Sequence, residues 1–254
     1  MLRPILADLH IHTVLSACAE VEMIPPLIVE QARSIGLGLI AITDHNACHN
    51  AEAVVRAAEA VGLSVLPGME LQTREEVHVL CIFDTVGQCV EWQRQVFDLL
   101  PPLANREETF GAQYVVDVTG EWVRTEERLL ATAADISLEQ AVSQVHALGG
   151  LVIPAHVDRP SFSMLANLGF VPPDLEADAL EVTPRFAPEK GFAMWPSLAR
   201  WPIVVDGDAH RLSEMQNRTL FKIESPCVRE ISLALRGQEG RKVVIEWPHT
   251  NSSA

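Results

Sequence analysis

Histidine and carboxylate side chains recur where short apolar runs of this sequence end. The first group is Asp8-Leu9-His10-Ile11-His12, which follows the apolar run Ile5-Leu6-Ala7. Alternate side chains of a β-strand face the same way, so the two imidazoles would project together, about 6.6 Å apart along the strand at roughly 3.3 Å per residue. Two ligands converging in this way could bind one metal ion, although a His-x-His pair alone is weak evidence.

Later apolar runs carry the same kinds of residue. The further candidates are Asp44 and His45 after 39–43, Glu70 after 63–66, His78 inside 77–83, His156 after 151–155, and Asp208 and His210 after 202–205. Each has an ordinary explanation when taken alone: Asp44 could cap the following helix, and His78 could be a hydrogen-bonded core histidine. Histidines and carboxylates gathered around one pocket, however, are typical ligands of zinc, manganese or iron. The joint pattern therefore predicts a metal site.

The elements that must position these residues alternate between short apolar strands and amphipathic helices. Strands are expected at 5–12, 39–43, 63–66, 77–83, 151–155, 179–183, 202–205 and 243–247. Helices are expected at 25–36, 51–61, 89–100, 137–149 and 228–235, with Pro25 and the capping-box pattern Ser137-Leu138-Glu139-Gln140 as start signals. This order is typical of an α/β protein with a mostly parallel sheet, closed here into a barrel. Such barrels place their chemistry at the carboxyl ends of the strands.

Residues 105–135 depart from the alternation, because they are mostly charged and poorly periodic in their middle. We interpret them as an inserted segment with helical pieces. The expected organisation is one domain spanning residues 1–254.

The composition narrows the class of partner and compartment. The chain has 254 residues, 48% apolar, with a net charge of −15, which argues against a nucleic-acid surface held by charge alone. No apolar run approaches the roughly 20 residues of a membrane helix, so no membrane partner is expected. The start of the sequence shows no signal-peptide pattern, and five cysteines without paired spacing indicate reduced thiols. Both observations favour a cytoplasmic protein.

The ordered set of motifs resembles one protein family. His10-x-His12, Thr43-Asp44-His45, Gly68-Met69-Glu70, His78, His156 and Asp208-Ala209-His210 look like the motifs of the PHP (polymerase and histidinol phosphatase) family, over residues 8 to 210. The resemblance implies a distorted seven-stranded (β/α) barrel and a site for three metals.

The resemblance also implies a ligand set. One metal would be held by His10, His12, Glu70 and Asp208, a second by His45, His210 and a loop residue, and a third by Glu70, His78 and His156. Asp8 and Asp44 would orient imidazoles. The loop departs from the family pattern, because it reads Ser16-Ala17-Cys18-Ala19-Glu20 where relatives carry a histidine or Ser-Asp-Gly. Glu20, Cys18 or no residue could complete the second site. We expect Glu20, since a carboxylate matches the other ligands better than a thiolate does.

The implied cofactors are two or three divalent transition metals (Zn, Mn or Fe), and the implied reaction is hydrolysis of a phosphomonoester or phosphodiester. Such metals lower the pKa of a bound water so that it can attack phosphorus. Arginine is expected to bind the phosphoryl oxygens, with Arg159, close to His156, as first candidate and Arg185 as second. Arg159 and Asp44 are the catalytic candidates.

Other functions remain open at this point. An amidohydrolase acting on C–N bonds also begins with His-x-His, but that group commonly uses a carboxylated lysine, and none of Lys190, Lys222 and Lys242 follows a central strand. A metal-stabilised regulatory module without activity is the third possibility. For an enzyme, the acidic chain favours a small phosphorylated substrate or a short oligonucleotide over duplex DNA.

Overall fold

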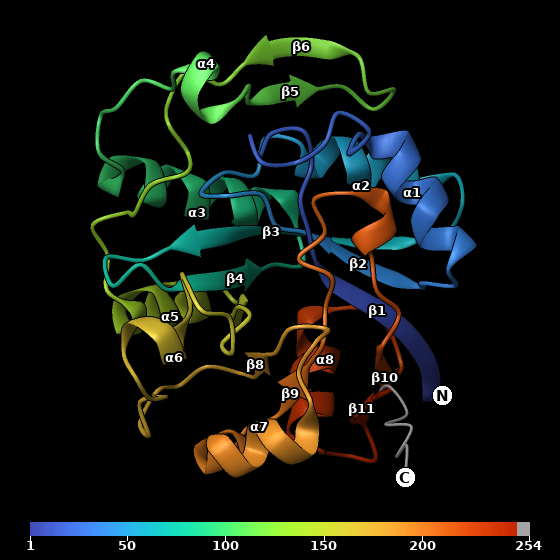
Figure 1. Cartoon of the computed structure of the whole chain (residues 1–254). Helices are drawn as coiled ribbons and strands as arrows, with labels where there is room; N and C mark the ends of the chain where they lie inside the picture. Colours follow the sequence, from blue (N-terminus) through green and yellow to red (C-terminus); the bar gives the residue numbers. More distant parts are fainter. Residues whose placement is uncertain (248–254) are drawn as a thin grey trace, which may run out of the picture.

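The apolar runs form the strands of a curled seven-stranded sheet in the computed structural model, which describes residues 1–247 (Figure 1). Within this sheet the strand order is β11-β10-β1-β2-β3-β4-β7, and β5–β6 and β8–β9 form two further ladders. The strands are β1 (Arg3–Ile11), β2 (Leu39–Ile42), β3 (Ser64–Gln72), β4 (His78–Ile82), β5 (Tyr114–Val116), β6 (Trp122–Thr125), β7 (Leu151–Pro154), β8 (Leu180–Glu181), β9 (Ile203–Val204), β10 (Thr219–Ile223) and β11 (Lys242–Ile245).

Helices connect and cover these strands. They are α1 (Pro25–Ser34), α2 (Ala51–Glu59), α3 (Val86–Leu99), α4 (Glu107–Phe110), α5 (Leu138–Ala147), α6 (Met164–Asn167), α7 (Pro188–Met194) and α8 (Val228–Leu235), with 3-10 turns η1 (Pro196–Arg200) and η2 (Leu212–Glu214). The start signals read from the sequence are confirmed: Pro25 opens α1, and Ser137 and Gln140 form the reciprocal capping box of α5. Five expected helices are therefore present with bounds shifted by a few residues.

The short ladder β8–β9 joins the two ends of the curl. The amide of Val157, just after β7, donates to the carbonyl of Glu181 in β8 at 2.8 Å. After β9, Ala209 exchanges backbone hydrogen bonds of 3.0 Å with His10 and His12 at the end of β1. The path β1-β2-β3-β4-β7-β8-β9 thus returns to β1. This ring is the distorted seven-stranded barrel that was expected, with β10 and β11 as an added antiparallel extension of β1.

The expected mostly parallel sheet was wrong. Only β1–β2, β2–β3 and β8–β9 pair in parallel, whereas β4 is antiparallel to both of its neighbours. The cause is the short connection 73–77, which can close a hairpin but cannot carry the crossover that a parallel pair needs. As a consequence, His78 begins β4 at the same edge where β3 and β7 end.

Strand β3 is longer than the predicted 63–66, because it continues through Pro67 and Gly68 to Gln72. A Cβ atom on Gly68 would lie 3.0 Å from the carbonyl oxygen of Cys81 and 3.2 Å from that of Ile42. The backbones of neighbouring strands therefore approach closely at this glycine. Glu70 consequently lies inside a strand, near its end, and not in the loop after it.

The inserted segment 105–135 is mainly a β-hairpin, so the expectation of helical pieces holds only for the four residues of α4. β-Branched and aromatic residues fill β5 and β6, and the turn between them contains Gly120 at φ +87°. The amide of Tyr114 donates to Val14 at 2.9 Å, which ties the hairpin to the loop after β1. Figure 1 shows this hairpin at the top of the molecule, above α3. Its membership in the same domain stays a prediction.

Alternate apolar residues of each strand divide between the two faces of the sheet. One face packs against α1, α2, α3 and α5, as Ile40 and Ile42 of β2 do. The other packs against α8, as Leu39 and Ala41 do. The strands are therefore buried on both sides, and polar side chains concentrate at the edge of the barrel. No helix within residues 1–247 is long and apolar enough to cross a membrane.

Candidate metal centre

The predicted ligands lie together at one edge of the barrel, although they come from six parts of the chain. His10 lies next to the last residue of β1 and His12 follows the strand, His45 follows β2, and Glu70 lies near the end of β3. The remaining members are His78 at the start of β4, His156 after β7, and Asp208 and His210 after β9. Backbone hydrogen bonds fix neighbours in register, as between the amide of Glu70 and the carbonyl of Asp44 (3.0 Å).

Four of these side chains have ligand atoms close enough to share one metal ion. His10 Nε2 and His12 Nε2 are 3.1 Å apart. Asp208 Oδ1 lies 3.4 and 3.3 Å from these nitrogens, and the Glu70 carboxylate oxygens lie 3.3 and 3.4 Å from them. A tetrahedron with bonds of about 2.0–2.1 Å has edges of about 3.3–3.4 Å. The set that the resemblance implied for the first metal is therefore a suitable zinc-type ligand set.

Glu70 is the centre of the cluster. Its Oε1 lies 2.8 Å from His78 Nδ1 and 3.1 Å from His156 Nε2. Its Oε2 lies 2.9 Å from His45 Nδ1, yet this oxygen is buried without a well-formed hydrogen bond in the described structure. A buried carboxylate oxygen without a hydrogen bond is costly. A cation among the imidazoles would satisfy it, so the residues present fit a metal.

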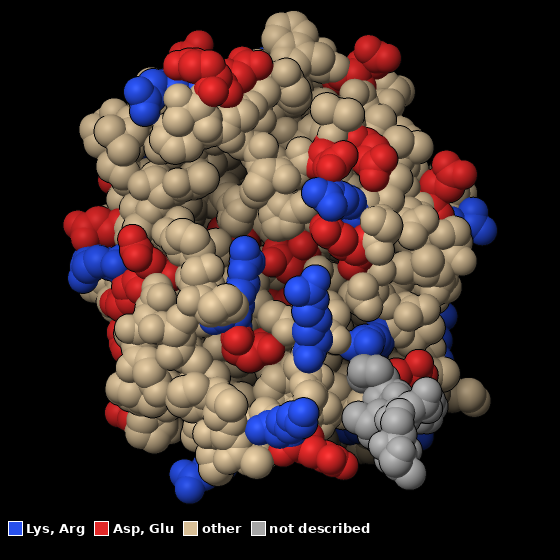
Figure 2. Space-filling model, viewed as in Figure 1, with Lys and Arg blue, Asp and Glu red and all other residues tan. Residues whose placement is uncertain are grey.

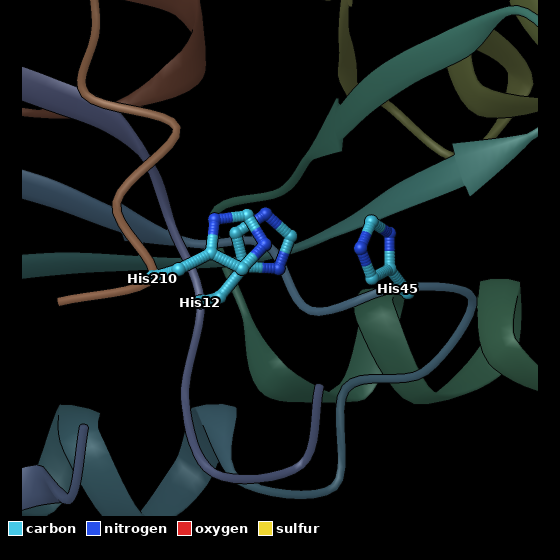
Figure 3. A group of neighbouring side chains, drawn as sticks. All are labelled: His12, His45 and His210. Atoms are coloured by element: carbon cyan, nitrogen blue, oxygen red, sulfur yellow. The ribbon is translucent and has the colours of Figure 1, made fainter. Parts of the chain in front are cut away.

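Two further sets of ligand atoms are close enough to share an ion. His12, His45 and His210 form one, and His45, Glu70 and His78 form the other. The rings of His12 and His210 are stacked with centroids 4.1 Å apart, and those of His12 and His45 are 4.6 Å apart (Figure 3). These two sets differ from those implied by the resemblance. In the first, His12 stands where a loop residue was expected beside His45 and His210. In the second, His45 stands where His156 was expected beside Glu70 and His78.

Burial and mutual charge set the protonation states. Burial raises the pKa of Glu70, but the surrounding histidines outweigh it and lower this pKa well below the usual range. Burial raises the pKa of Asp208 as well, but His10 and His12 outweigh burial, so this pKa is also lowered. The pKa of His12 is well below its usual value because of burial and the neighbouring His210. An ionised carboxylate and a neutral imidazole are the forms that bind metal.

Left-handed backbone conformations gather at this cluster. Asn46, His156, Phe162 and Asp208 have φ values of 49°, 31°, 51° and 46°. Non-glycine residues rarely adopt this region, and each instance costs on the order of 1–3 kcal/mol. Phe162 also stacks on the ring of His78, with centroids 5.3 Å apart. The fold tolerates this strain where it aims ligands, which is typical of a functional site.

Glu181 is a functional residue that sequence reasoning missed. Its carboxylate lies 3.0 and 3.1 Å from His10 Nδ1 and accepts the amide of His156 at 2.9 Å. Burial lowers the pKa of His10, but Glu181 and the other nearby carboxylates raise it well above its usual value. The available signal was a single carboxylate within the apolar run 179–183, since a buried charge needs a partner.

Asp8, which was expected to orient an imidazole, has a different role. Its oxygens accept the backbone amides of Gly207 (2.9 Å), Gln216 (2.7 Å) and His10 (3.3 Å). Burial raises the pKa of Asp8 to about 7, although these hydrogen bonds act to lower it. Asp8 therefore fixes the loop after β9, and Glu181 takes the imidazole-orienting role.

Asp44, a catalytic candidate that was also expected to orient an imidazole, lies behind the imidazole of His12 and the loop after β1. It is fully buried, and its carboxylate accepts hydrogen bonds of 2.7 Å from the Thr13 amide, the Thr13 hydroxyl and the Ser16 hydroxyl. Ser16 Oγ also lies 3.0 Å from His12 Nδ1. Asp44 thus orients His12 through Ser16, and a catalytic role for it stays a prediction.

The loop after β1 does not bring Glu20 to the cluster. The Glu20 side chain is 51% exposed, and its Oε1 accepts from Arg211 Nε at 2.8 Å. Cys18 is also exposed, but its thiol lies near enough to His45 and His210 to be affected by their charge. Burial alone would raise the pKa of this thiol, but the two histidines lower it to about 6. Neither Glu20 nor Cys18 belongs to a set of ligand atoms close enough to share an ion within residues 1–247, so the loop ligand of this site stays a prediction.

The two arginine candidates differ in position. Arg159 Nη1 donates to Asp208 Oδ2 at 2.8 Å, and 39% of its side chain is exposed. Arg185 is exposed on the loop after β8, and residues 1–247 show no ion pair between it and the cluster. Arg159 therefore lies at the metal centre, whereas Arg185 does not contact it.

Comparison with known proteins gives a family match and several relatives. A protein-family model described as "PHP domain" matches residues 8–152, more than half of the chain. The Bacillus subtilis (strain 168) protein YqxK, described as uncharacterized, is 22% identical over 282 residues, covering 97% of this chain and 65% of YqxK.

Two solved structures share the fold. The lesion-specific endonuclease EndoQ from Pyrococcus furiosus superposes with a TM-score of 0.69 and 22% identity, covering 95% of this chain and 58% of EndoQ. A candidate metal-dependent phosphoesterase from Bifidobacterium adolescentis gives a TM-score of 0.55 and 20% identity, covering 81% of this chain and 87% of the other. The chain thus spans less than two thirds of YqxK and of EndoQ.

Proposed function

The chain belongs to the PHP domain family, and we propose that it is a metal-dependent phosphoesterase that hydrolyses a phosphomonoester or a phosphodiester. The observation that carries the proposal is the close approach of two imidazoles and two carboxylates, with Glu70 reaching further histidines. Neighbouring metal sites that share one carboxylate are suited to holding a phosphoryl group and its attacking water together.

The proposed cofactors are two or three divalent transition metals, namely zinc, manganese or iron. The proposed ligand sets are His10, His12, Glu70 and Asp208; His45 and His210 with a residue of the loop; and Glu70, His78 and His156. When bound, such cations supply a water that loses its proton near neutral pH and positive charge for the phosphoryl oxygens.

Arg159 is the residue that we propose to contact the substrate. One of its five N–H donors is used by Asp208, and the exposed part of the guanidinium leaves others for a ligand. It can therefore bind a phosphoryl oxygen while staying anchored beside a metal ligand. Arg185 is a second candidate, reached only if the substrate extends toward the loop after β8.

We propose a small phosphorylated molecule or a short oligonucleotide as substrate. EndoQ has been solved with a 27-mer duplex that carries an abasic lesion at its active site, but this chain spans 58% of the related EndoQ chain. With a net charge of −15, duplex binding through phosphate contacts is unfavourable. Acidic and basic side chains are interspersed near the centre of the face in Figure 2. The five unpaired cysteines support a cytoplasmic location.

The amidohydrolase alternative is less well supported. Its usual carboxylated lysine has no counterpart near the cluster, since Lys190 lies in α7, Lys222 in β10 and Lys242 in β11. Glu70 holds the central position instead. A regulatory module without activity would need the same ligands but no substrate-binding group. Because Arg159 is available beside the cluster to bind a substrate, it argues against such a module.

The test is an activity screen of zinc-loaded and manganese-loaded protein. The substrates are a panel of phosphomonoesters, short single-stranded oligonucleotides and the matching duplexes, with N-acyl amino acids as the C–N control. Hydrolysis of a phosphoester that is abolished by chelation and by Glu70→Gln is the expected result. Metal-replete protein that cleaves only the C–N control, or none of the panel, would contradict the proposal.

A further inference from the structure

The segment between β7 and α6 carries Phe162, whose ring covers one of the proposed metal ligands. This ring stacks on the imidazole of His78 at an interplanar angle of 24°, with the centroids 5.3 Å apart. The carbonyl of Phe162 also accepts the amide of His78 at 3.3 Å, and Figure 1 shows the segment (yellow) beside β4. One face of the ring therefore lies against the metal centre.

The rest of the Phe162 ring is accessible from outside. The residue is 41% exposed, whereas the large aromatic residues of the core, such as Trp92 and Phe83, are fully buried. A single exposed apolar side chain is ordinary on a protein surface. This one differs because it rests on a proposed metal ligand, where a group bound at the metals could reach it.

The backbone of Phe162 adopts a conformation that a bulky side chain disfavours. Its φ is +51°, and among the non-glycine residues of 1–247 with positive φ it is the only one with an apolar side chain. A bulky residue in this region is a clear outlier and costs free energy, which glycine would avoid. Such strain is typical of functional sites, so it is a second indication that the ring serves a purpose at this position.

Several anchors fix the loop that carries this ring. The hydroxyl of Ser163 donates to the carbonyl of Arg159 at 2.6 Å, and the carboxylate of Asp158 accepts the amide and the hydroxyl of Thr183 at 2.7 and 2.8 Å. Arg159 itself donates to Asp208 at 2.8 Å. One short loop thus holds a guanidinium beside one ligand of the cluster and an aromatic ring on another.

We propose that Phe162 determines specificity, because its ring stacks on a planar aromatic group that the substrate carries close to its reacting phosphate. The proposal rests on the proposed phosphoesterase function and specifies its substrate class. A phosphoryl group bound between Arg159 and a metal at His78 would lie near this ring. Every aromatic ring has a face that can stack in this way. The preferred substrate is therefore a phosphoester whose alcohol carries a nucleobase or another aryl ring, and not a plain sugar or polyol phosphate.

Binding of phosphonates tests the proposal separately from activity, because a C–P bond replaces the ester bond that would be hydrolysed. Zinc-loaded protein is titrated calorimetrically with benzylphosphonate and with cyclohexylmethylphosphonate, which differ in aromaticity but hardly in size. Phe162→Leu keeps an apolar cover on His78 without the aromatic face, and Phe162→Tyr keeps the ring. Phe170→Leu is the matched control, since Phe170 is an exposed phenylalanine of the same connection between β7 and β8.

The unchanged protein, Phe162→Tyr and Phe170→Leu should bind benzylphosphonate more tightly than its cyclohexyl analogue. Phe162→Leu should lose this preference: its affinity for the aromatic phosphonate should fall by about 5- to 100-fold, the usual effect of losing one stacked ring, and its affinity for the cyclohexyl analogue should hardly change. Kinetics with adenosine 5′-phosphate and ribose 5-phosphate, which share the reacting ester, identify the source of the ring. A preference for the former that depends on Phe162 indicates a nucleobase, and a preference confined to the benzyl pair indicates a smaller aryl group.

Equal affinities of the unchanged protein for the two phosphonates, no binding of either, or a preference that survives Phe162→Leu would overturn the proposal. Loss of metal from Phe162→Leu would also overturn it, because the ring would then serve only to hold His78 in place. Cleavage of phosphoesters without any ring preference would reject this proposal and leave the proposed function standing. A Phe162-dependent preference for benzylphosphonate in a protein that hydrolyses no phosphoester would do the reverse.

Discussion

At the scale of single residues, Glu70 is the side chain on which the metal centre depends most. Its two oxygens lie within 3.4 Å of nitrogens from His10, His12, His45, His78 and His156. Without its charge, these five imidazoles would face one another, and Asp208 would be the one carboxylate left among the ligands proposed for the first and third metals. Both metal affinity and imidazole protonation should therefore change together when Glu70 is replaced.

Glu70→Gln should lower metal content more than replacement of any single histidine ligand, because Glu70 belongs to two of the proposed ligand sets. The expected loss is more than one ion per chain, measured by elemental analysis after reconstitution and desalting. Glu230→Gln is the control, since Glu230 is also buried but binds Arg241 at 2.8 Å, away from the cluster. Equal metal content in the Glu70 variant and the unchanged protein would refute the ligand assignment.

Arg159→Ala should leave the metal content intact and lower kcat/KM. Removing one donor to a charge that develops in a transition state costs about 10²–10³ in rate, equivalent to about 2.7–4 kcal/mol. Steady-state kinetics on the substrate identified in the screen, together with metal analysis, measure both quantities. Arg74→Ala is the control, because Arg74 is an exposed arginine paired with Asp135. Loss of metal in the Arg159 variant would mean that Arg159 is structural.

At the scale of elements, Asn50 joins three segments around the metal centre. Its Nδ2 donates to Thr13 Oγ1 and to the carbonyl of Tyr114, both at 2.9 Å, and its Oδ1 accepts the amide of Val116 at 3.0 Å. The first contact fixes the loop after β1, and the others fix the inserted hairpin. This single side chain therefore couples the insertion to the loop that carries Cys18.

Asn50→Ala should lower the free energy of unfolding by about 2–4 kcal/mol, because buried backbone groups of Tyr114 and Val116 would lose their partner at about 1–3 kcal/mol each. Urea denaturation measures this change. Asn217→Ala is the matched control: Asn217 donates only to the carbonyl of Ile35 and is exposed, so its effect should stay within about 0.5 kcal/mol. Similar effects of the two substitutions would show that Asn50 does not couple these segments.

The end of α5 is tied to the segment before β8 by a titratable pair. His146 Nε2 lies 2.9 Å from Asp178 Oδ2, and this hydrogen bond raises the pKa of His146 above its ordinary value of 6.5. The folded state therefore binds this proton more tightly than the unfolded state does. The resulting stabilisation is complete well below pH 6.5 and is lost as the pH rises through the folded-state pKa.

His146→Gln should accordingly destabilise the protein most at low pH, and the difference in melting temperature from the unchanged chain should shrink above neutral pH. Melting curves of both proteins, recorded at intervals of about one pH unit between about pH 5.5 and 9, resolve this trend. A difference that stays constant with pH would mean that the pair contributes through packing and not through the proton.

At the scale of the whole molecule, the candidate metal centre lies where the ring of strands closes. Its ligands come from β1, β3 and β4 and from the segments after β2, β7 and β9, so bound metals would link segments distant in the sequence. The short β8–β9 ladder contributes only two paired residues from each strand. Metals at the open end of the ring should therefore stabilise the closed form.

Chelation should lower the melting temperature. A ligand present at about a thousand times its Kd stabilises the folded state by about 4 kcal/mol, which for a domain of this size corresponds to roughly 10 °C. Calorimetry with and without chelator measures the shift, and chelator already saturated with zinc is the control. An unchanged melting temperature after verified metal removal would show that the ring is closed by protein contacts alone.

Local patterns in the sequence determined most of the elements and the ligand types. Alternation within a strand placed His10 and His12 on one face, and start signals such as Pro25 and Ser137 located helices, because these effects depend on residues only a few positions apart. The ends of the strands are also set by local residue patterns. Because the ligands lie at or near strand ends, the sequence already indicated which histidines and carboxylates would come together.

The tertiary structure decided how these pieces meet. The direction of β4 follows from a short hairpin, and closure of the ring depends on hydrogen bonds between residues some 200 positions apart, as between His10 and Ala209. Glu181 became visible as a partner of His10 only through packing. The conformation of the loop after β1 depends on anchors from Asp44 and His210. Contacts of this kind carry no local signal in the chain, because each is made by residues that only the complete fold brings together.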